Sequence, residues 1–286
     1  MFTTQLIDGR ALAKEITDRT AAQLAKISGT PGLAIILVGN DPASEVYVKV
    51  KERACEKLGI HFALHRFPAD ANEADVLRKL EELNSDAKVH GIVVQLPLPS
   101  HLNEDRITQA IDWRKDVDGF HPMNVERYLT GQSGQAPSLI RSIMALLQKT
   151  DEQMNNKEAL VLAYSDTFFL PMRKALESVG LQVSAQRADE MQVDDVKKAD
   201  VVIIAAGKSK YLRGDMLKPK SILIDVGINE MPDGSVTGDV DAESVEGVAA
   251  WRSPVPGGVG PVTVAMLLQS TVEAFIVKEK APHSLR

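Results

Sequence analysis

The chain has 286 residues, of which 44% are hydrophobic and 25% are charged, and 33 Lys and Arg against 39 Asp and Glu give a formal net charge of −6. This length suffices for one large or two ordinary domains, and the mixed composition excludes disordered and collagen-like chains. The nearly balanced charge gives no electrostatic reason to expect nucleic acid as a partner. The single cysteine, Cys55, excludes an internal disulfide framework and a cysteine-based zinc site.

The sequence also gives no support for a secreted protein, a membrane protein or a metal-binding protein. The segment MFTTQLIDGRALAKEI lacks a basic stretch followed by an apolar one, and no uninterrupted apolar run approaches the roughly 20 residues that span a bilayer. His61 and His65 lie in a predicted strand, where side chains four residues apart are about 13 Å apart, so they are too distant to share a metal. We therefore expect a cytoplasmic protein with no metal and no membrane partner.

Short β-branched runs alternate with helical stretches along the chain, which predicts an α/β fold with parallel sheets. The first part is predicted to contain strands at 33–39, 61–67 and 91–99 and helices at 44–58 and 73–85. The run LAIILVG is apolar throughout, as expected of a strand buried on both faces. Pro97 and Pro99 break the third strand.

A small, polar segment at 130–137 predicts an interdomain turn or hinge. Beyond it the pattern predicts helices at 138–150 and 171–180, strands at 158–165, 181–187, 199–207 and 221–227, and a last helix from 263 to about 279. Pro171 is expected to open its helix, since proline is tolerated in a first helical turn. These elements predict a second, doubly wound sheet.

Tyr47 and Lys51 are four residues apart in a predicted helix, so their side chains share one face. An aromatic ring beside an ammonium group is suited to stack on a flat heterocycle while the amine acts at its edge. A solvated surface helix with one half-buried tyrosine explains the same pattern, because Lys49 and Lys57 lie nearby. The pair alone does not decide between these interpretations.

Two further segments carry polar groups where ligands gather. Gln95 ends a predicted buried strand, at the carboxyl edge where open α/β sheets bind ligands, although it could equally be an ordinary hydrogen-bonding residue there. Asp116 and Asp118 precede Gly119 in KDVDGFHPMN, a pattern that also occurs in plain turns and lacks the other ligands of a calcium loop. Residues 253–263, SPVPGGVGPVT, form a rigid loop whose backbone amides could approach a ligand closely.

In this order and at these intervals, YVKVK, VVQLPLP, KDVDGFHPMN, IDVGIN and PVPGGVGP resemble the bifunctional methylenetetrahydrofolate dehydrogenase/cyclohydrolase family over essentially the whole chain. The resemblance implies a homodimer in which each chain has two α/β domains and a cleft between them. The expected catalytic, folate-binding domain comprises residues 1–136 and 265–286, and the Rossmann-like NAD(P)-binding domain comprises 137–264. The implied activity is oxidation of 5,10-methylenetetrahydrofolate with NADP or NAD, then hydrolysis of the methenyl product to 10-formyltetrahydrofolate.

The resemblance also implies roles for single residues. Lys51 would act on the one-carbon bridge, Gln95 would orient Lys51, and Asp118 would accept hydrogen bonds from the pterin. Tyr47 would stack on the folate, and Ser44 would support the same helix face. The folate-binding set implied by the resemblance is Ser44, Tyr47, Lys51, Val94, Gln95, Leu96, Asp118, Pro256, Gly257, Gly258, Val259 and Gly260. The cofactor-binding set is Ala163, Tyr164, Ser165, Arg187 and Ile228.

The expected cofactor loop departs from the family's pattern of roughly G-R/A-S-x-x-x-G-x-P. The two glycines are replaced by Ala163 and Phe169, and Asp166 adds negative charge where phosphates are expected to lie. Asp189 also weakens the case for Arg187 as a ligand of the NADP 2′-phosphate. Three alternatives therefore stay open beside the bifunctional enzyme: a cyclohydrolase that has lost hydride transfer, a silent folate-binding partner subunit, and an unrelated Rossmann-type dehydrogenase.

Overall fold

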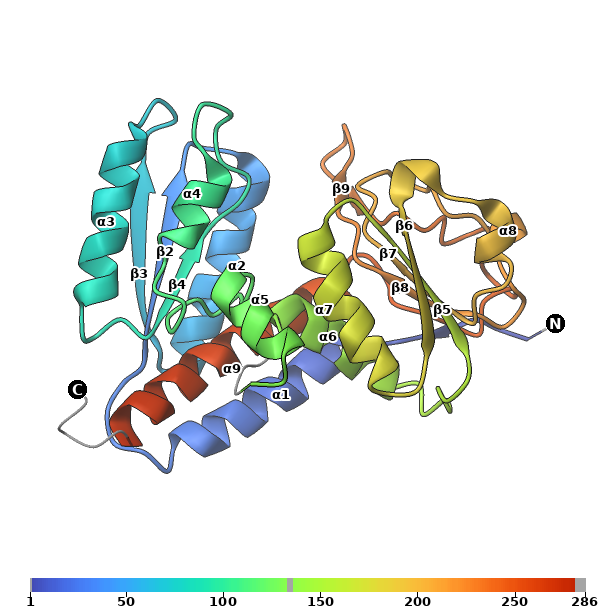
Figure 1. Cartoon of the computed structure of the whole chain (residues 1–286), viewed down its shortest axis with the longest axis horizontal. Coiled ribbons are helices and arrows are strands. Elements are labelled where there is room, and N and C mark those ends of the chain that lie inside the picture. The colour runs from blue at the N-terminus through green and yellow to red at the C-terminus, as the bar shows by residue number, and fades with distance from the viewer. Residues whose placement is uncertain (1, 133–135, 281–286) are drawn as a thin grey trace. The chain divides into compact units, whose positions relative to one another are not determined.

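The computed structural model describes residues 2–132 and 136–280, which divide into two compact units (Figure 1). Among the described residues, the six-stranded unit consists of residues 2–13, 128–132 and 139–263, and the three-stranded unit consists of residues 14–127, 136–138 and 264–280. Part of the predicted hinge at 130–137, residues 133–135, lies outside the described residues.

The three-stranded unit is built on a parallel sheet with the strand order β3-β2-β4. Its strands are β2 (Gly32–Val38), β3 (His61–Phe67) and β4 (Gly91–Val94), and its helices are α2 (Pro42–Leu58), α3 (Glu73–Ser85), α4 (Glu104–Gln109) and most of α5 (Pro122–Leu129). All seven residues of β2 are buried, as its continuous apolar run predicts. Successive side chains of β2 point to opposite faces of the sheet, and all of them are buried, so the sheet is covered on both sides.

Each face of β2 has its own core. Leu33, Ile35 and Leu37 pack in one cluster with side chains of α2 and of the last helix, α9 (Val259–Lys280). Ala34, Ile36 and Val38 pack in a second cluster with side chains of α3 and α4. Because α2 lies against one face, residues on its inner side are held beside the carboxyl end of the sheet.

The ends of α2 follow from its sequence. The Asp41 carboxylate accepts a 2.8 Å hydrogen bond from the Ser44 amide, and Pro42 occupies the first helical turn. Gly59 closes the helix in the left-handed conformation at φ 69°, and its amide donates back to the last turn. The helix that carries Tyr47 and Lys51 is thus fixed at both ends.

The six-stranded unit contains a parallel sheet with the order β1-β11-β8-β7-β5-β6. Its strands are β1 (Gln5–Leu6), β5 (Glu158–Ala163), β6 (Gln182–Arg187), β7 (Val201–Ile204), β8 (Ile222–Asp225) and β11 (Trp251–Arg252). A separate antiparallel pair is formed by β9 (Asn229–Glu230) and β10 (Val236–Thr237). Its helices are α6 (Ser138–Gln148), α7 (Asp166–Glu177), η1 (Ala188–Glu190), α8 (Val193–Val196) and η2 (Gly214–Met216). Helix α1 (Gly9–Leu24) begins in this unit, and its residues from Lys14 onward belong to the three-stranded unit.

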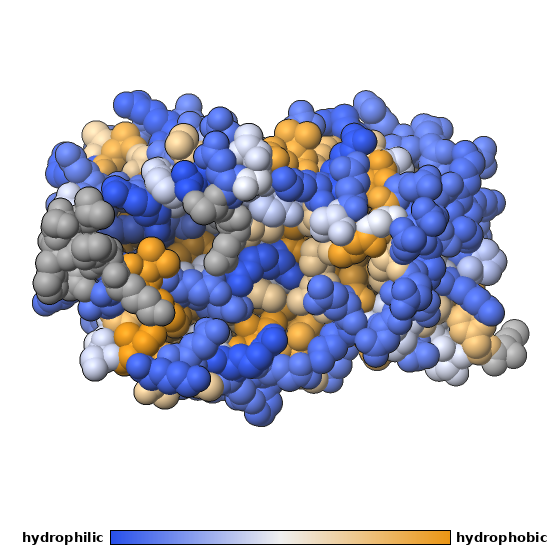
Figure 2. Space-filling view, turned by 60° about the horizontal axis from the view of Figure 1, so that its bottom comes forward, coloured by the Kyte–Doolittle hydropathy of each residue, from blue (hydrophilic) through white to orange (hydrophobic). Residues whose placement is uncertain are grey.

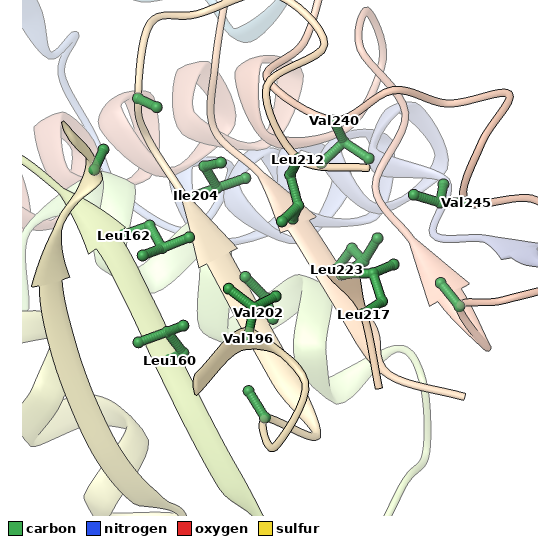
Figure 3. Packing of buried hydrophobic residues seen from close by; sticks show 14 residues of the cluster. Leu160, Leu162, Val196, Val202, Ile204, Leu212, Leu217, Leu223, Val240 and Val245 are labelled. Carbon is green, nitrogen blue, oxygen red and sulfur yellow. The ribbon is translucent and has the colours of Figure 1, made fainter. Parts of the chain in front are cut away.

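One face of this sheet is covered by a compact apolar cluster (Figure 3). Leu160 and Leu162 of β5 point to the same side as the residues Val202, Ile204 and Leu223 of the next two strands. Leu212, Leu217 and Val240, which come from the segments that follow β7 and β10, close over them (Figure 3). The parallel register brings the carboxyl ends of β5, β7 and β8 to one edge of the sheet.

Several predicted bounds were wrong. Helix α7 begins at Asp166, so Pro171 lies inside the helix and does not open it. Strand β4 ends at Val94 because Pro97 and Pro99 have no amide for a ladder, and α9 begins at Val259, four residues before the predicted start.

Residues 2–13 group with the six-stranded unit because β1 pairs with β11. A two-residue strand has no periodicity that could be read from the sequence. The expected domain limits at 136/137 and 264/265 stay a prediction.

Helix α9 is an exception to the expectation that no apolar segment approaches the length that spans a bilayer. Residues Val259–Glu279 of α9 are long and apolar enough to cross a membrane by length and composition. However, 56% of that window is buried inside the protein, as in the core helix of an α/β unit. The face shown in Figure 2 is largely hydrophilic, with smaller hydrophobic areas between the polar side chains. The burial of α9 explains its apolar composition.

Candidate active site

One face of α2 presents the residues singled out from the sequence. Ser44 is buried, whereas Tyr47 and Lys51 are half-buried, and the spacings of three and four place them along one side of the helix. Burial raises the pKa of the Tyr47 hydroxyl, which keeps this side chain neutral. The face therefore combines a neutral aromatic ring with a single partly buried amine.

Gln95 joins this face to the end of the sheet. Its amide donates a 2.9 Å hydrogen bond to the Ile36 carbonyl, which continues the ladder between β2 and β4. Its side-chain Oε1 accepts a 2.9 Å hydrogen bond from Lys51 Nζ, and its Nε2 donates to the Leu96 carbonyl at 2.8 Å. Ser44 Oγ reaches the same carbonyl at 3.5 Å. The Gln95 amide group is thereby oriented with its oxygen toward the amine.

Lys51 and Asp118 influence each other electrostatically. Burial lowers the pKa of the Lys51 amine, and the negative charge of Asp118 opposes that shift in part. Burial raises the pKa of the Asp118 carboxyl, while the Lys51 charge lowers it and Asp116 adds to the rise. Both shifts favour the neutral forms, so the site can lose or gain a proton closer to neutral pH than either group could in water.

The turn at residues 116–121 holds Asp118 in place. Asp116 accepts hydrogen bonds from the Gly119 amide at 3.1 Å, the His121 amide at 2.8 Å and Asn124 Nδ2 at 3.0 Å. Asp116 thus forms the turn itself, and among residues 2–132 and 136–280 no side chain donates a hydrogen bond to the Asp118 carboxylate. That carboxylate is half-buried and is left with acceptor capacity for a ligand.

The remaining residues on this side differ in what they can offer a ligand. The Val94 side chain is buried in the core between α3 and the sheet, so only its backbone can reach outward, whereas Leu96 is exposed.

Across the described parts of the chain, no group of three or more His, Cys, Asp or Glu side chains is arranged to hold a metal ion.

The proline- and glycine-rich segment 256–260 belongs to the six-stranded unit, where it packs against the first residue of α1, Gly9. A Cβ on Gly9 would lie 1.9 Å from the Gly258 carbonyl oxygen, and one on Gly258 would lie 2.5 Å from the Pro254 carbonyl oxygen. Helix α9 begins within this segment, at Val259. Close packing of the chain on itself is therefore one reason for these glycines, alongside the backbone approach to a ligand that we expected.

The predicted cofactor residues gather at the carboxyl edge of the six-stranded sheet. Ala163 ends β5, and Ser165 caps α7 by accepting a hydrogen bond from the Thr167 amide at 3.2 Å. The Arg187 guanidinium lies 5.5 Å from the centre of the Tyr164 ring. Ile228, which follows β8, is 46% exposed. An exposed apolar side chain and a stacked cation at this edge are suited to a nucleotide.

A cation that we did not predict completes this group. A hydrogen bond to Tyr164 raises the pKa of the Lys208 amine, whose Nζ also lies 4.9 Å from the centre of the Tyr211 ring. Lys208 follows β7 in a segment with no motif that identifies a ligand, so only the fold could bring it beside Tyr164. Asp225 and Asp239, both buried at the same edge, were missed for the same reason.

These donors fit a phosphate-bearing dinucleotide in spite of the altered loop. Arg187 and Lys208 supply two exposed cations, although Arg187 shares its charge with Asp189 at 3.3 Å. Phe169 is only half-buried, and Asp166 is exposed at the start of α7, where its carboxylate disfavours an anion. The two cations, Arg187 and Lys208, support binding of the dinucleotide phosphates, whereas the Asp166 carboxylate weakens that binding.

The six-stranded parallel sheet carries cations at its carboxyl edge, and the same chain carries a half-buried pair of an amine and a side-chain amide. Together these features define a nucleotide-dependent enzyme with acid–base chemistry. Residues 7–118 match the description "Tetrahydrofolate dehydrogenase/cyclohydrolase, catalytic domain", and residues 137–279 match the NAD(P)-binding domain of the same family. The chain belongs to the tetrahydrofolate dehydrogenase/cyclohydrolase family.

Individual relatives agree over nearly the full length. Bifunctional protein FolD of Polynucleobacter necessarius is 42% identical over 274 residues, which are 94% of this chain and 96% of that protein. The crystal structure of bifunctional FolD from Campylobacter jejuni is 39% identical with a TM-score of 0.90, covering 96% of this chain and 99% of that one. The Trypanosoma brucei enzyme, solved with NADP and an inhibitor, is 32% identical with a TM-score of 0.92, covering 98% and 100%. The predicted family and fold class are confirmed.

Proposed function

We propose that the protein oxidises 5,10-methylenetetrahydrofolate to the 5,10-methenyl form with NAD(P)+ and hydrolyses that product to 10-formyltetrahydrofolate. The observation that carries the proposal is the 2.9 Å hydrogen bond between Lys51 and Gln95 in a chain of this family. The relatives named bifunctional support both steps, and no finding favours a cyclohydrolase without hydride transfer or a silent subunit.

Lys51 is the proposed proton-transfer group of the hydrolysis. Water that attacks the methenyl carbon must lose a proton, and an amine whose pKa is lowered by burial is able to accept it. The C–N5 bond then breaks with return of a proton to N5, which leaves the formyl group on N10. Gln95 accepts a hydrogen bond from the Lys51 amine and so fixes the direction in which the amine points.

Asp118 and Tyr47 are the proposed folate-binding groups beside Lys51. The planar amino and ring N–H groups of a pterin match the free acceptor positions of the Asp118 carboxylate. Tyr47 would stack on the ring system, and Ser44 would support the Leu96 carbonyl that also holds Gln95. The backbones of Val94 and Leu96, with residues 256–260, complete the proposed folate contacts.

The proposed dinucleotide contacts are the edge residues of the six-stranded sheet. A nicotinamide held here would supply the hydride acceptor for oxidation of the methylene group to the methenyl form. Ala163, Tyr164 and Ser165 would lie against the phosphates, Arg187 would meet the adenosine end, and Ile228 would contact the nicotinamide end. The Trypanosoma brucei relative is described as a complex with NADP, which supports NADP as the cofactor.

The assembly and location of the protein are further proposals. We infer a homodimer and a cytoplasmic location, without nucleic acid or membrane partners. The acidic net charge of −6 is consistent with a small-molecule partner in place of nucleic acid.

A paired assay on the purified protein tests the proposed function. Loss of methenyltetrahydrofolate absorbance above the spontaneous rate reports hydrolysis, and reduction of NADP+ or NAD+ with methylenetetrahydrofolate reports oxidation. Activity in both assays is expected. Hydrolysis alone would overturn the oxidative half, and inactivity in both assays would overturn the proposal as a whole.

A further inference from the structure

Two buried carboxylates at the edge of the six-stranded sheet have no part in the chemistry described so far. Asp225 ends β8 and is 3% exposed, and Asp239 follows β10 and is fully buried. A buried carboxylate is costly unless hydrogen bonds compensate it, so its partners indicate what it holds in place.

Asp239 collects donors from two separate segments. Its Oδ2 accepts from the Ala206 amide at 2.5 Å and the Gly207 amide at 3.1 Å. Its Oδ1 accepts from the Lys208 amide at 2.8 Å and from Asn229 Nδ2 at 2.9 Å. The carboxylate therefore ties the segment after β7 to the segment after β8.

Asp225 completes a reciprocal arrangement. Its carboxylate accepts from the amides of Gly227, Asp239 and Val240 at 2.9, 3.0 and 2.9 Å. A Cβ on Gly227 would lie 2.2 Å from the Asp239 carboxyl carbon, and one on Gly238 would lie 1.9 Å from an Asp225 carboxylate oxygen. Each carboxylate thus requires a glycine in the segment that carries the other.

Three successive amides that converge on one anion resemble a phosphate-binding nest. Here the anion is the protein's own Asp239, so these amides are not available to a cofactor phosphate. The carboxylate instead fixes the backbone of 206–208. Val240, next in the chain, points into the apolar cluster beside Leu212, which anchors Asp239 from behind (Figure 3).

The fixed segments carry the exposed groups of the proposed dinucleotide site. Lys208, whose amide is bound to Asp239, presents its amine beside Tyr164. Ile228 lies between Gly227 and Asn229, both of which contact the same carboxylate, and it stays 46% exposed. Asp239 itself is buried and presents no exposed group to the site, but it holds in place the backbone of Lys208 and the residues on either side of Ile228.

We propose that Asp239 is a positioning residue for dinucleotide binding, which orients Lys208 and Ile228 by holding residues 206–208 and Asn229. This inference rests on the proposed function, because it assumes that the sheet edge binds NAD(P). It makes Asp239 necessary for cofactor affinity and unnecessary for methenyl hydrolysis, whose residues Lys51, Gln95 and Asp118 lie in the three-stranded unit.

The test compares Asp239→Asn with a matched control, Asp241→Asn, two residues along the chain. Calorimetric titration with NADP+ and NAD+ is run at a temperature well below the unfolding midpoint of each variant. We expect Asp239→Asn to weaken dinucleotide binding about tenfold or more, because a side-chain amide N–H cannot accept from the backbone amides. Its methenyl hydrolysis should stay within about twofold of the wild type, and Asp241→Asn should change neither quantity.

A second variant keeps the test decisive if Asp239→Asn does not fold. Asn229→Asp preserves shape but places a carboxyl against Asp239, with Asp225 also nearby, so the new carboxyl has a raised pKa. The ratio of its NADP+ dissociation constant to that of the wild type at the same pH should be about ten at pH 8. This ratio should fall toward one at pH 5.5, where a protonated carboxyl can donate as the Asn229 amide does.

The outcomes separate the two proposals. Unchanged dinucleotide affinity in folded Asp239→Asn, or a pH-independent affinity ratio for Asn229→Asp, overturns the positioning role alone. Failure of the wild type to bind NADP+ or NAD+ overturns the oxidative half of the proposed function, and the positioning role with it.

Discussion

Lys51 Nζ donates a 2.9 Å hydrogen bond to Oε1 of Gln95, although the two residues are 44 positions apart in the chain. The bond joins the inner face of α2 to the residue that follows β4. Gln95 offers an uncharged acceptor, so the bond orients the amine without the electrostatic stabilisation that a carboxylate would give to the ammonium form. Burial can therefore lower the pKa of Lys51.

Replacing this neutral partner by a charged one should shift the pH dependence of hydrolysis. In Gln95→Glu, the carboxylate stabilises the ammonium form of Lys51 and raises its pKa by about one unit or more. The acid limb of the pH–rate profile for methenyl hydrolysis should move to higher pH by a similar amount. An unchanged acid limb in a folded, folate-binding variant would show that Lys51 is not the titrating group.

Asp118→Asn should shift the same limb in the opposite direction. The Asp118 charge raises the pKa of Lys51, so its removal lowers that pKa further. The charge-assisted hydrogen bonds to the pterin are also lost, which at about 1.5–3 kcal/mol corresponds to a rise in the folate KM of roughly tenfold to a hundredfold. Steady-state kinetics between pH 6 and 9 measures both effects, with the exposed Asp105→Asn as the control. A normal KM would contradict the assigned folate contact.

Cofactor affinity should improve when Asp166 loses its charge. The Asp166 carboxylate stands at the positive end of α7, where it competes with a phosphate, and such interactions amount to about 0.3–1 kcal/mol. Calorimetry should show NADP+ binding about twofold to fivefold tighter in Asp166→Asn. Asp194→Asn, at the start of α8, removes a similar exposed charge and should have no effect. Weaker binding in Asp166→Asn would mean that the carboxylate contacts the cofactor favourably.

The sequence was most informative where one physical effect dominates. The apolar run of β2 reflects burial on both faces, and the spacing of Tyr47 and Lys51 follows from helix geometry alone. The start of α7 was predicted wrongly because Pro171 suggested a first turn, whereas Ser165 provides the cap. Asp239 carried no local signal, since its donors come from segments about 10 and 30 residues away. Long-range polar contacts of this kind can be identified only when the three-dimensional fold is known.

Stability should fall in mild acid through His90. Burial, with Lys278 and Lys115 nearby, lowers the pKa of this imidazole to about 4, and its Nδ1 accepts a 3.0 Å hydrogen bond from the Gly32 amide. The unfolded chain binds the proton near pH 6.5, so His90's contribution is complete above that pH and is lost as the pH falls toward 4. Between pH 7.5 and pH 5.0 the loss is about 2 kcal/mol.

Urea unfolding of the wild type and His90→Gln at both pH values measures this loss. Asp225 contributes with the opposite sign, because burial raises its pKa to about 6 and stability is lost as the pH rises from 3.8 through 6. The difference between the two proteins removes that effect. Equal pH dependence of their unfolding free energies would exclude His90 as the acid-sensitive group.

The most direct measurement of the central claim is methenyltetrahydrofolate hydrolysis by Lys51→Met, with folate binding measured on the same protein. Lys49→Met, an exposed lysine two residues earlier on α2, is the matched control. We expect Lys51→Met to lose at least about a hundredfold in hydrolysis while it still binds folate, because a proton-transfer group contributes 10²–10⁴-fold. Near-normal turnover in Lys51→Met would contradict the mechanism.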